Sequence, residues 1–457
     1  MKKALIIILD IIVILGLVGA GYFVWQKYFA QKSTNTTTQK LELDQSKVKT
    51  HLSKVENAPN TYWVRGSFDL FWNEIEKEKG QLDWELMDDR IRKFNHQQTY
   101  IIPVIKPFAN WDQNACHTDT KYEAKYDPQK GGAIKVGKPC DMTAYADFLT
   151  KAVERYDGDG TDDMPGLTIP IKYWEIMNEP EMQGGVTGGM GEELKFFVGT
   201  SQEYFDILKT SYETIKKTDS KAKVLPAGMA GTQKNFIDFW GPVYEAGAGN
   251  YFDIANIHSI STDVKKEDLN IINYKKFLEK YNVGDKPIFI TEVQFGDLAT
   301  KPADLKKFEI LMAKSTAFSL ALGADKLFYI DNWLFWDKTA DKTNKDEKQT
   351  KKTKDNPALS GSTHKVYLNL IKQLNNFDKV DCAQNKYTEG PTTQGATSEI
   401  FQCKFTFENK YVYVLWGKAP IPADITGQIK VTDIYGVTKQ IQASELQLSS
   451  EPVFVEM

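Results

Sequence analysis

The stretch IKYWEIMNEP (171–180) decides how the rest of the chain is interpreted. An apolar run typical of a buried strand ends in Asn178, Glu179 and Pro180. Proline removes a ladder donor, so the strand should stop directly after the acid. The following segment predicts an amphipathic helix, because four apolar side chains share one helical stripe, at Tyr204, Leu208, Tyr212 and Ile215. Together they form one strand–helix unit with polar groups at the carboxyl end of the strand.

The same unit recurs along the chain. Further short β-like runs, each followed by a helical pattern, lie at 61–66, 99–108, 222–228, 252–260, 286–295 and 325–335. Such alternation predicts a parallel sheet covered by helices. A (β/α)8 TIM barrel takes about 250 residues, which the chain can supply. A doubly wound open sheet is the rival, but no glycine-rich phosphate-binding fingerprint follows the first strand.

The barrel prediction lacks one strand. We count seven, so the first should precede Thr61, where only KLELD (40–44) or KVKTHLSKV (47–55) is available. The charged segment 339–365 predicts a mobile loop after the last barrel strand, with a lid over a cleft as the alternative. Beyond residue 376, short β runs separated by turns predict a small antiparallel β domain.

The N-terminus predicts a membrane helix. Residues 4–25 are mostly apolar, long enough to cross a membrane once, and follow two lysines. A signal peptide cleaved after Val18-Gly19-Ala20 is the alternative. We expect a membrane anchor at 1–30, a flexible linker at 31–50, a catalytic barrel at 51–375 and a β domain at 376–457. Either interpretation of the N-terminus predicts an extracytoplasmic protein, anchored or, after cleavage, secreted.

The charge balance bears on the partners of the protein, and the cysteines bear on its disulfides and metal sites. A net charge of −4, with no basic excess, argues against nucleic acid as a partner. The four cysteines, Cys116, Cys140, Cys382 and Cys403, allow three disulfide pairings, among which the sequence cannot choose. Pairing neighbours in sequence is the simplest. A zinc site has less support, because no C-x-x-C motif is present.

An acidic cluster resembles part of a calcium loop. It lies in DGDGTDDM (157–164) and offers the carboxylates of Asp157, Asp159, Asp162 and Asp163. The sixth position is not glycine and the twelfth is not glutamate, so an acidic turn is the alternative. A structural calcium is the one cofactor that we consider, and the expected chemistry requires none.

The chemistry should lie at the carboxyl ends of the barrel strands. Glu179 and Glu292 each close a predicted strand, and Arg65 and His258 do so too. Two carboxylates at one mouth suit glycoside hydrolysis, in which one protonates the leaving oxygen and the other attacks the sugar or activates water. Arg65 would keep Glu292 ionised, and His258 would orient a carboxylate. Glu175 shares its parity with Glu179 but lies four residues deeper.

The motifs resemble those of the retaining glycoside hydrolases of clan A. IKYWEIMNEPEM is similar to their Asn-Glu-Pro signature, PIFITEVQFG to their nucleophile strand, and FWNEIEKEKGQLDWELMDDRI to the stretch after their second strand. The resemblance covers residues 60–375. It implies that Glu179 is the acid/base and Glu292 the nucleophile, with Asn178 on the 2-hydroxyl and Arg65 and His258 in support. It also implies a stacking platform for a carbohydrate substrate at Trp333 or Trp336. Trp111 is a further stacking candidate, with core packing as the alternative for each tryptophan.

The sequence also departs from the clan pattern. The third strand runs into KPFANWD (106–112) without a histidine, and Ile260 stands where some members have an aromatic residue. These departures concern the substrate subsites, which loops 109–140 and 181–200 should shape. The resemblance implies double displacement with retained configuration and carboxyl groups about 5–5.5 Å apart. A non-catalytic surface carbohydrate-binding protein and a transglycosylase are the alternatives.

Overall fold

The computed structural model describes residues 40–54, 58–125, 133–184, 194–260, 266–295, 302–330, 361–390 and 395–457. The predicted membrane segment, Trp333, Trp336 and residues 339–360 of the expected loop at 339–365 lie outside these ranges. The end of that expected loop is helical instead, because a helix starts at Ser362. Within the described ranges, no helix is long and apolar enough to cross a membrane.

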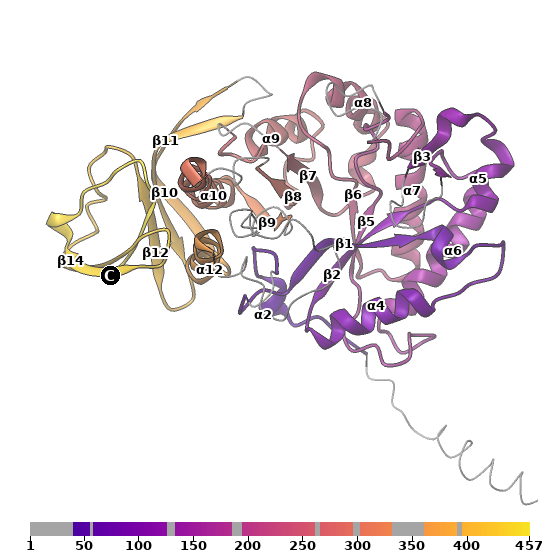
Figure 1. The fold of residues 1–457 in the computed structure, drawn as a ribbon, viewed down its shortest axis with the longest axis horizontal. Helices are drawn as coiled ribbons and strands as arrows, with labels where there is room; N and C mark the ends of the chain where they lie inside the picture. Colours follow the sequence, from indigo (N-terminus) through magenta and orange to yellow (C-terminus); the bar gives the residue numbers. More distant parts are fainter. Residues whose placement is uncertain are drawn as a thin grey trace, which may run out of the picture.

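Parallel strands alternate with helices through most of the chain (Figure 1). The strands are β1 (Trp63–Phe71), β2 (Tyr100–Lys106), β5 (Tyr173–Ile176), β6 (Lys223–Pro226), β7 (Ala255–Ile260), β8 (Ile288–Gln294) and β9 (Ala324–Tyr329). They form two parallel sheets in the orders β1-β2-β5-β6 and β7-β8-β9. Every residue of β2 is buried, as expected of a strand covered on both faces. The predicted α/β class and parallel sheet are confirmed.

Backbone contacts join the two sheets between β6 and β7. Met229, just beyond β6, pairs in parallel with Ile257 of β7. The Asp253 amide donates to the Val224 carbonyl at 2.8 Å. The edge strands of the two sheets are therefore connected.

The other two edges, β9 and β1, are joined by the short segment 51–54. Leu52 pairs with Leu327 of β9, and the Ser53 amide donates to the Leu327 carbonyl at 3.0 Å. On its other side, the Lys54 amide donates to the Trp63 carbonyl of β1 at 2.8 Å. Segment 51–54 thus occupies the place of the missing first strand, within the second of the two predicted stretches, and the hydrogen bonds form a closed ring.

Helices cover the ring. The longer ones are α4 (Glu85–His96), α6 (Met142–Tyr156), α7 (Ser201–Thr218), α8 (Lys234–Glu245), α9 (Ile271–Lys280), α10 (Pro302–Ala321) and α12 (Ser362–Leu374). All of these except α10 are amphipathic. The predicted stripe of α7 packs inward, with Tyr204, Leu208 and Ile215 fully buried. Thr200 and Glu203 form a capping box that starts α7. Shorter elements are α2 (Gln45–Val48), α3 (Trp72–Ile75), α5 (Asn110–Cys116), η3 (Thr120–Tyr122), β3 (Glu123–Lys125), β4 (Ala133–Lys135) and η4 (Ala248–Asn250).

The clan-like stretch after β1 stabilises the fold. The Glu76 carboxylate accepts from Trp72 Nε1 and from the Gly80 amide, both at 2.6 Å. Arg155 of α6 donates two hydrogen bonds to Asp88 of α4, at 2.9 and 2.6 Å. The stretch therefore fixes its own turn through Glu76 and pairs α4 with α6 through Asp88.

The end of the predicted linker is ordered. The Leu41 amide donates to the Gly158 carbonyl at 2.7 Å, and the Asp44 amide donates to the Tyr100 hydroxyl at 3.0 Å. Helix α2 then leads into segment 51–54. Residues 41–50, expected as linker, therefore pack under the ring together with the residues that follow them.

The C-terminal part is a six-stranded antiparallel sheet, as predicted (Figure 1). Its order is β10-β11-β12-β15-β13-β14, from β10 (Lys379–Glu389), β11 (Ala396–Thr406), β12 (Tyr411–Trp416), β13 (Gln428–Thr432), β14 (Thr438–Gln442) and β15 (Val453–Glu456), with η7 (Ala443–Glu445). The sheet packs on α10, where Phe318 lies 6.1 Å from Phe401 and Lys314 lies over Trp416.

Candidate active site

Glu179 follows the end of β5 through a sharp backbone bend. The strand ends at Ile176, and both Met177 and Glu179 have left-handed backbones, with φ of 71° and 38°. Such conformations cost about 1–3 kcal/mol each and gather at functional sites. The bend therefore ends the strand at Ile176, before the chain reaches Pro180. The Glu179 side chain is buried, with 5% exposed.

Glu292, in β8, is held by cations. Its Oε1 accepts from Arg65 Nη1, and its Oε2 lies 3.8 Å from His258 Nδ1. Burial by itself raises the pKa of this carboxyl, but the charges of His258, Arg65 and Lys106 bring the pKa below its usual value. The Glu292 side chain keeps 19% exposure, so its carboxylate stays accessible from solvent.

Arg65, in β1, is fixed by the buried Glu175 of β5. Arg65 Nε donates to Glu175 Oε2 at 2.7 Å, and Nη2 donates to Oε1 at 2.5 Å. Nη2 also donates to Asn178 Oδ1 at 2.7 Å. Glu175 is thus structural, as its depth suggested, and it aims the guanidinium at Glu292. The bond to Oδ1 orients the Asn178 side chain and leaves its amide nitrogen outside the contacts with Arg65.

His258, in β7, bonds to Glu179. Its Nδ1 lies 2.6 Å from Glu179 Oε1, and its Nε2 lies 3.1 Å from the Thr291 hydroxyl. Burial by itself lowers the histidine pKa, but Glu292 and the bond to Glu179 raise it above the usual value. The ring lies against Gly228, where an added Cβ would be 2.0 Å from Nε2.

The two glutamates lie close together. One carboxylate oxygen of each, with a ring nitrogen of His258, lies within 4.8 Å of the others. This spacing would also suit a metal ion, but the carboxylates already bond to Arg65 and His258. Those bonds favour an ion-paired carboxylate site over a metal centre.

Two buried ionisable residues at this site were missed from the sequence. Lys106 ends β2, and burial lowers its pKa. Its position at the end of an apolar strand was a usable signal. Glu181 was placed in a loop, yet it is buried, and its Oε1 accepts from the Ala230 amide at 2.6 Å. Burial, aided by the Glu179 charge, raises the Glu181 pKa to about 7.

Of the three predicted stacking tryptophans, only Trp111 lies within the described residues. It sits in α5, half-buried, with Nε1 donating to the Glu76 carbonyl at 3.1 Å and its ring 5.3 Å from Trp72, edge to face. These contacts match the core-packing alternative. Stacking on a sugar stays a prediction for Trp111.

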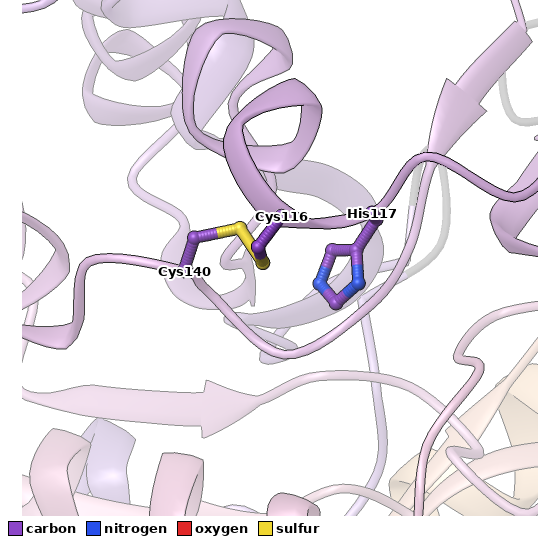
Figure 2. Close-up of side chains that lie close together, drawn as sticks. All are labelled: Cys116, His117 and Cys140. Carbon is purple, nitrogen blue, oxygen red and sulfur yellow. A yellow bond between two sulfur atoms is a disulfide. The ribbon is translucent and has the colours of Figure 1, made fainter.

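Both disulfides join cysteines that are neighbours in sequence. The pairs are Cys116–Cys140 and Cys382–Cys403. Figure 2 shows His117 beside the first pair, a grouping whose spacing would suit a metal. Because its two sulfurs are bonded to each other, they are not thiolate ligands. The first disulfide instead closes the loop that follows β2.

The acidic turn uses its carboxylates locally. Asp163 accepts from the Gly158 and Gly160 amides at 2.9 and 2.8 Å, and Asp157 accepts from the Asp159 amide at 2.9 Å. Asp162 has a left-handed backbone, as in a tight turn. Among the described residues, these four do not form a group with metal-ligand spacing. The hydrogen bonds favour the acidic-turn alternative, and calcium binding stays an untested prediction.

Comparison with known proteins supports the fold. No family model and no curated protein matches the chain. Its structure is similar to a family 39 glycoside hydrolase from the gut symbiont Bacteroides cellulosilyticus WH2, at 17% identity, over 87% of this chain and 76% of that chain, with a TM-score of 0.53. It is also similar to a GH39 beta-xylosidase from Caulobacter crescentus, at 10% identity, over 90% and 91% of the two chains, with a TM-score of 0.50. The chain therefore has the fold of these glycoside hydrolases, in line with its resemblance to clan A.

Proposed function

We propose that this chain is a retaining glycoside hydrolase, with Glu292 as nucleophile and Glu179 as acid/base, acting on a carbohydrate in a (β/α)8 barrel. The observation that carries the proposal is the close approach of the two carboxylates, of which one oxygen each lies within 4.8 Å of the other. Retaining enzymes hold their carboxyl groups about 5–5.5 Å apart, whereas inverting enzymes need about 6.5–9.5 Å to admit a water. The spacing therefore supports double displacement.

The surroundings suit the two roles. Arg65 and His258 stabilise ionised Glu292, the form that attacks the anomeric carbon. Glu179 protonates the leaving oxygen in that step and later deprotonates the water that releases the sugar. Asn178, oriented by Arg65, would donate its amide N–H to the 2-hydroxyl.

We also propose that the protein works outside the cytoplasm, tethered through residues 4–25 or released by cleavage. This proposal rests on the length and apolar character of that segment. Protease accessibility of the folded region on intact cells would test it, since a cytoplasmic protein would be protected.

A panel of aryl glycosides and polysaccharides tests the activity, with wild type and Glu292→Ala compared. Glu213→Ala is the matched control, because Glu213 is an exposed glutamate of α7. We expect turnover by wild type and Glu213→Ala, and a loss of at least about a thousandfold in Glu292→Ala. Sugar binding without turnover by wild type would support the carbohydrate-binding alternative. Transfer to added acceptor sugars in preference to water would identify a transglycosylase.

A further inference from the structure

A chain of buried hydrogen bonds runs behind His258, away from the open side of the site. His258 Nε2 lies 3.1 Å from Thr291 Oγ1, which lies 2.7 Å from Asn256 Oδ1. Asn256 Nδ2 lies 3.1 Å from the Pro226 carbonyl. Asn256, His258 and Thr291 are all buried, so water does not substitute for these partners.

The direction of each bond follows from the carbonyl at the end. The Pro226 carbonyl only accepts, so the Asn256 amide nitrogen faces it and Asn256 Oδ1 faces Thr291. Because Oδ1 also only accepts, the single Thr291 hydroxyl proton points to Asn256. The Thr291 oxygen must then accept from His258, so the proton of that bond lies on Nε2.

We propose that Thr291 and Asn256 are positioning residues that keep a proton on His258 Nε2, so that His258 and Glu179 share one proton across the Nδ1–Oε1 contact. In the neutral ring Nδ1 has no proton and accepts from protonated Glu179. In the charged ring Nδ1–H donates to the Glu179 carboxylate. The 2.6 Å contact suits either form.

The consequence concerns the acid step, so the kinetic part of this inference rests on the proposed function. Once Glu179 has given up its proton, the lone pair of neutral Nδ1 faces a carboxylate. This repulsion favours retention of the proton and keeps the acid available to higher pH. A histidine free to move its proton to Nδ1 would instead donate to the Glu179 carboxylate, stabilise its ionised form, and leave the protonated acid available only at lower pH.

Other charged groups act on the same pair. Glu292 of β8 and Arg65 of β1 act on His258, Lys106 of β2 acts on Glu292, and Glu179 acts on the neighbouring Glu181. These groups remain in place when Thr291 is changed. The raised pKa of His258 agrees with a proton held between the two side chains.

Thr291→Val tests the proposal, because it removes the hydroxyl and preserves the shape, and Thr291→Ser is the matched variant that keeps the hydroxyl. On an aryl glycoside that wild type hydrolyses, the basic limb of kcat/KM should move down by about one pH unit in Thr291→Val. Thr291→Ser should keep the wild-type limb. An unmoved limb in folded Thr291→Val would overturn the proposal.

The tautomer can be measured without any activity. The chain has five histidines, so 15N-histidine NMR of the full chain can resolve His258, assigned by its loss in His258→Gln. We expect Nε2–H in wild type across the pH range and a shift toward Nδ1–H in Thr291→Val. Neutral Nδ1–H in wild type would refute the proposal, even if Thr291→Val failed to fold. If the glycoside panel shows no turnover while Nε2–H is found, the proposed function fails and the proton placement stands.

Discussion

At the scale of single residues, Arg65 links three strands of the site. It bonds to Glu175 and approaches Asn178 after β5, and it pairs with Glu292 of β8. Glu175 is fully buried, so its charge depends on this guanidinium. The depth of Glu175 was foreseeable from its place in the strand, and so was the gathering of Arg65 and His258 near the glutamates, although both lie inside their strands rather than at the ends. Thr291 and Asn256 were not, because only the side-by-side placement of β7 and β8 brings them behind His258.

Replacing Arg65 by methionine should destabilise the protein by about 3–5 kcal/mol, because it leaves the buried Glu175 charge uncompensated. Lys234→Met is the control, since Lys234 is 87% exposed where it pairs with Asp238, itself 59% exposed. An exposed pair contributes about 0–1 kcal/mol. Urea unfolding measures both. Equal losses in the two variants would disprove the proposed dependence of Glu175 on Arg65.

Replacing Lys106 by methionine should move the acidic limb of kcat/KM to higher pH. Lys106 helps to hold the pKa of Glu292 below its usual value, so its loss makes ionised Glu292 less favourable. Because the pKa of Glu292 is lower in the folded state than in the unfolded state, its ionisation stabilises the fold at pH values above the unfolded-state pKa. This stabilisation is lost as the pH falls through the folded-state pKa. A pH–rate profile tests the shift, and an unchanged acidic limb would argue against it.

At the scale of elements, the first strand was the hardest feature to predict. Segment 51–54 contains a single apolar residue, Leu52, and a four-residue stretch has too few positions to show a period. Its place comes from neighbours distant in sequence. Lys326 of β9 donates to the Val48 and Thr50 carbonyls at 2.6 and 2.7 Å, which fixes the residues that lead into the segment. The other strands carry longer apolar runs and were predictable.

The bend after β6 must contain glycine at position 228. A Cβ on Gly228 would lie 2.0 Å from His258 Nε2, so Gly228→Ala should displace the ring that bonds to Glu179. We expect at least about a hundredfold loss of kcat/KM. Gly241→Ala is the control, because Gly241 lies in α8 and its added Cβ would meet only the Tyr281 hydroxyl, at 3.2 Å. Full activity in Gly228→Ala would contradict the required fit.

At the scale of the whole molecule, the ring and the C-terminal sheet share one core. A continuous cluster of buried apolar side chains runs from Leu52 to Phe454. The carboxylates of Asp268 and Glu267, after β7, accept from the Ala396 and Ser398 amides of β11 at 2.9 and 2.8 Å. The turns made the β domain predictable from the sequence. The hydrogen bonds of the buried Asp268 and Glu267 to β11 were not predictable.

This shared core predicts that the two parts unfold together. Calorimetry of the full chain should give one transition whose calorimetric and van't Hoff enthalpies agree. Weakening the link through Asp268→Ala should lower that single midpoint, because it removes the acceptor of the Ala396 amide. Two separate transitions in wild type would show that the parts are stable independently.

The central claim is that Glu292 attacks the sugar and forms a covalent intermediate. Incubation of wild type with an activated 2-deoxy-2-fluoro glycoside of the preferred sugar, followed by peptide mass spectrometry, tests it most directly. We predict one added sugar on the peptide that contains Glu292, none in Glu292→Ala, and a label that is lost as activity returns. A label on another residue, or turnover of the natural substrate with no label on Glu292, would contradict the account.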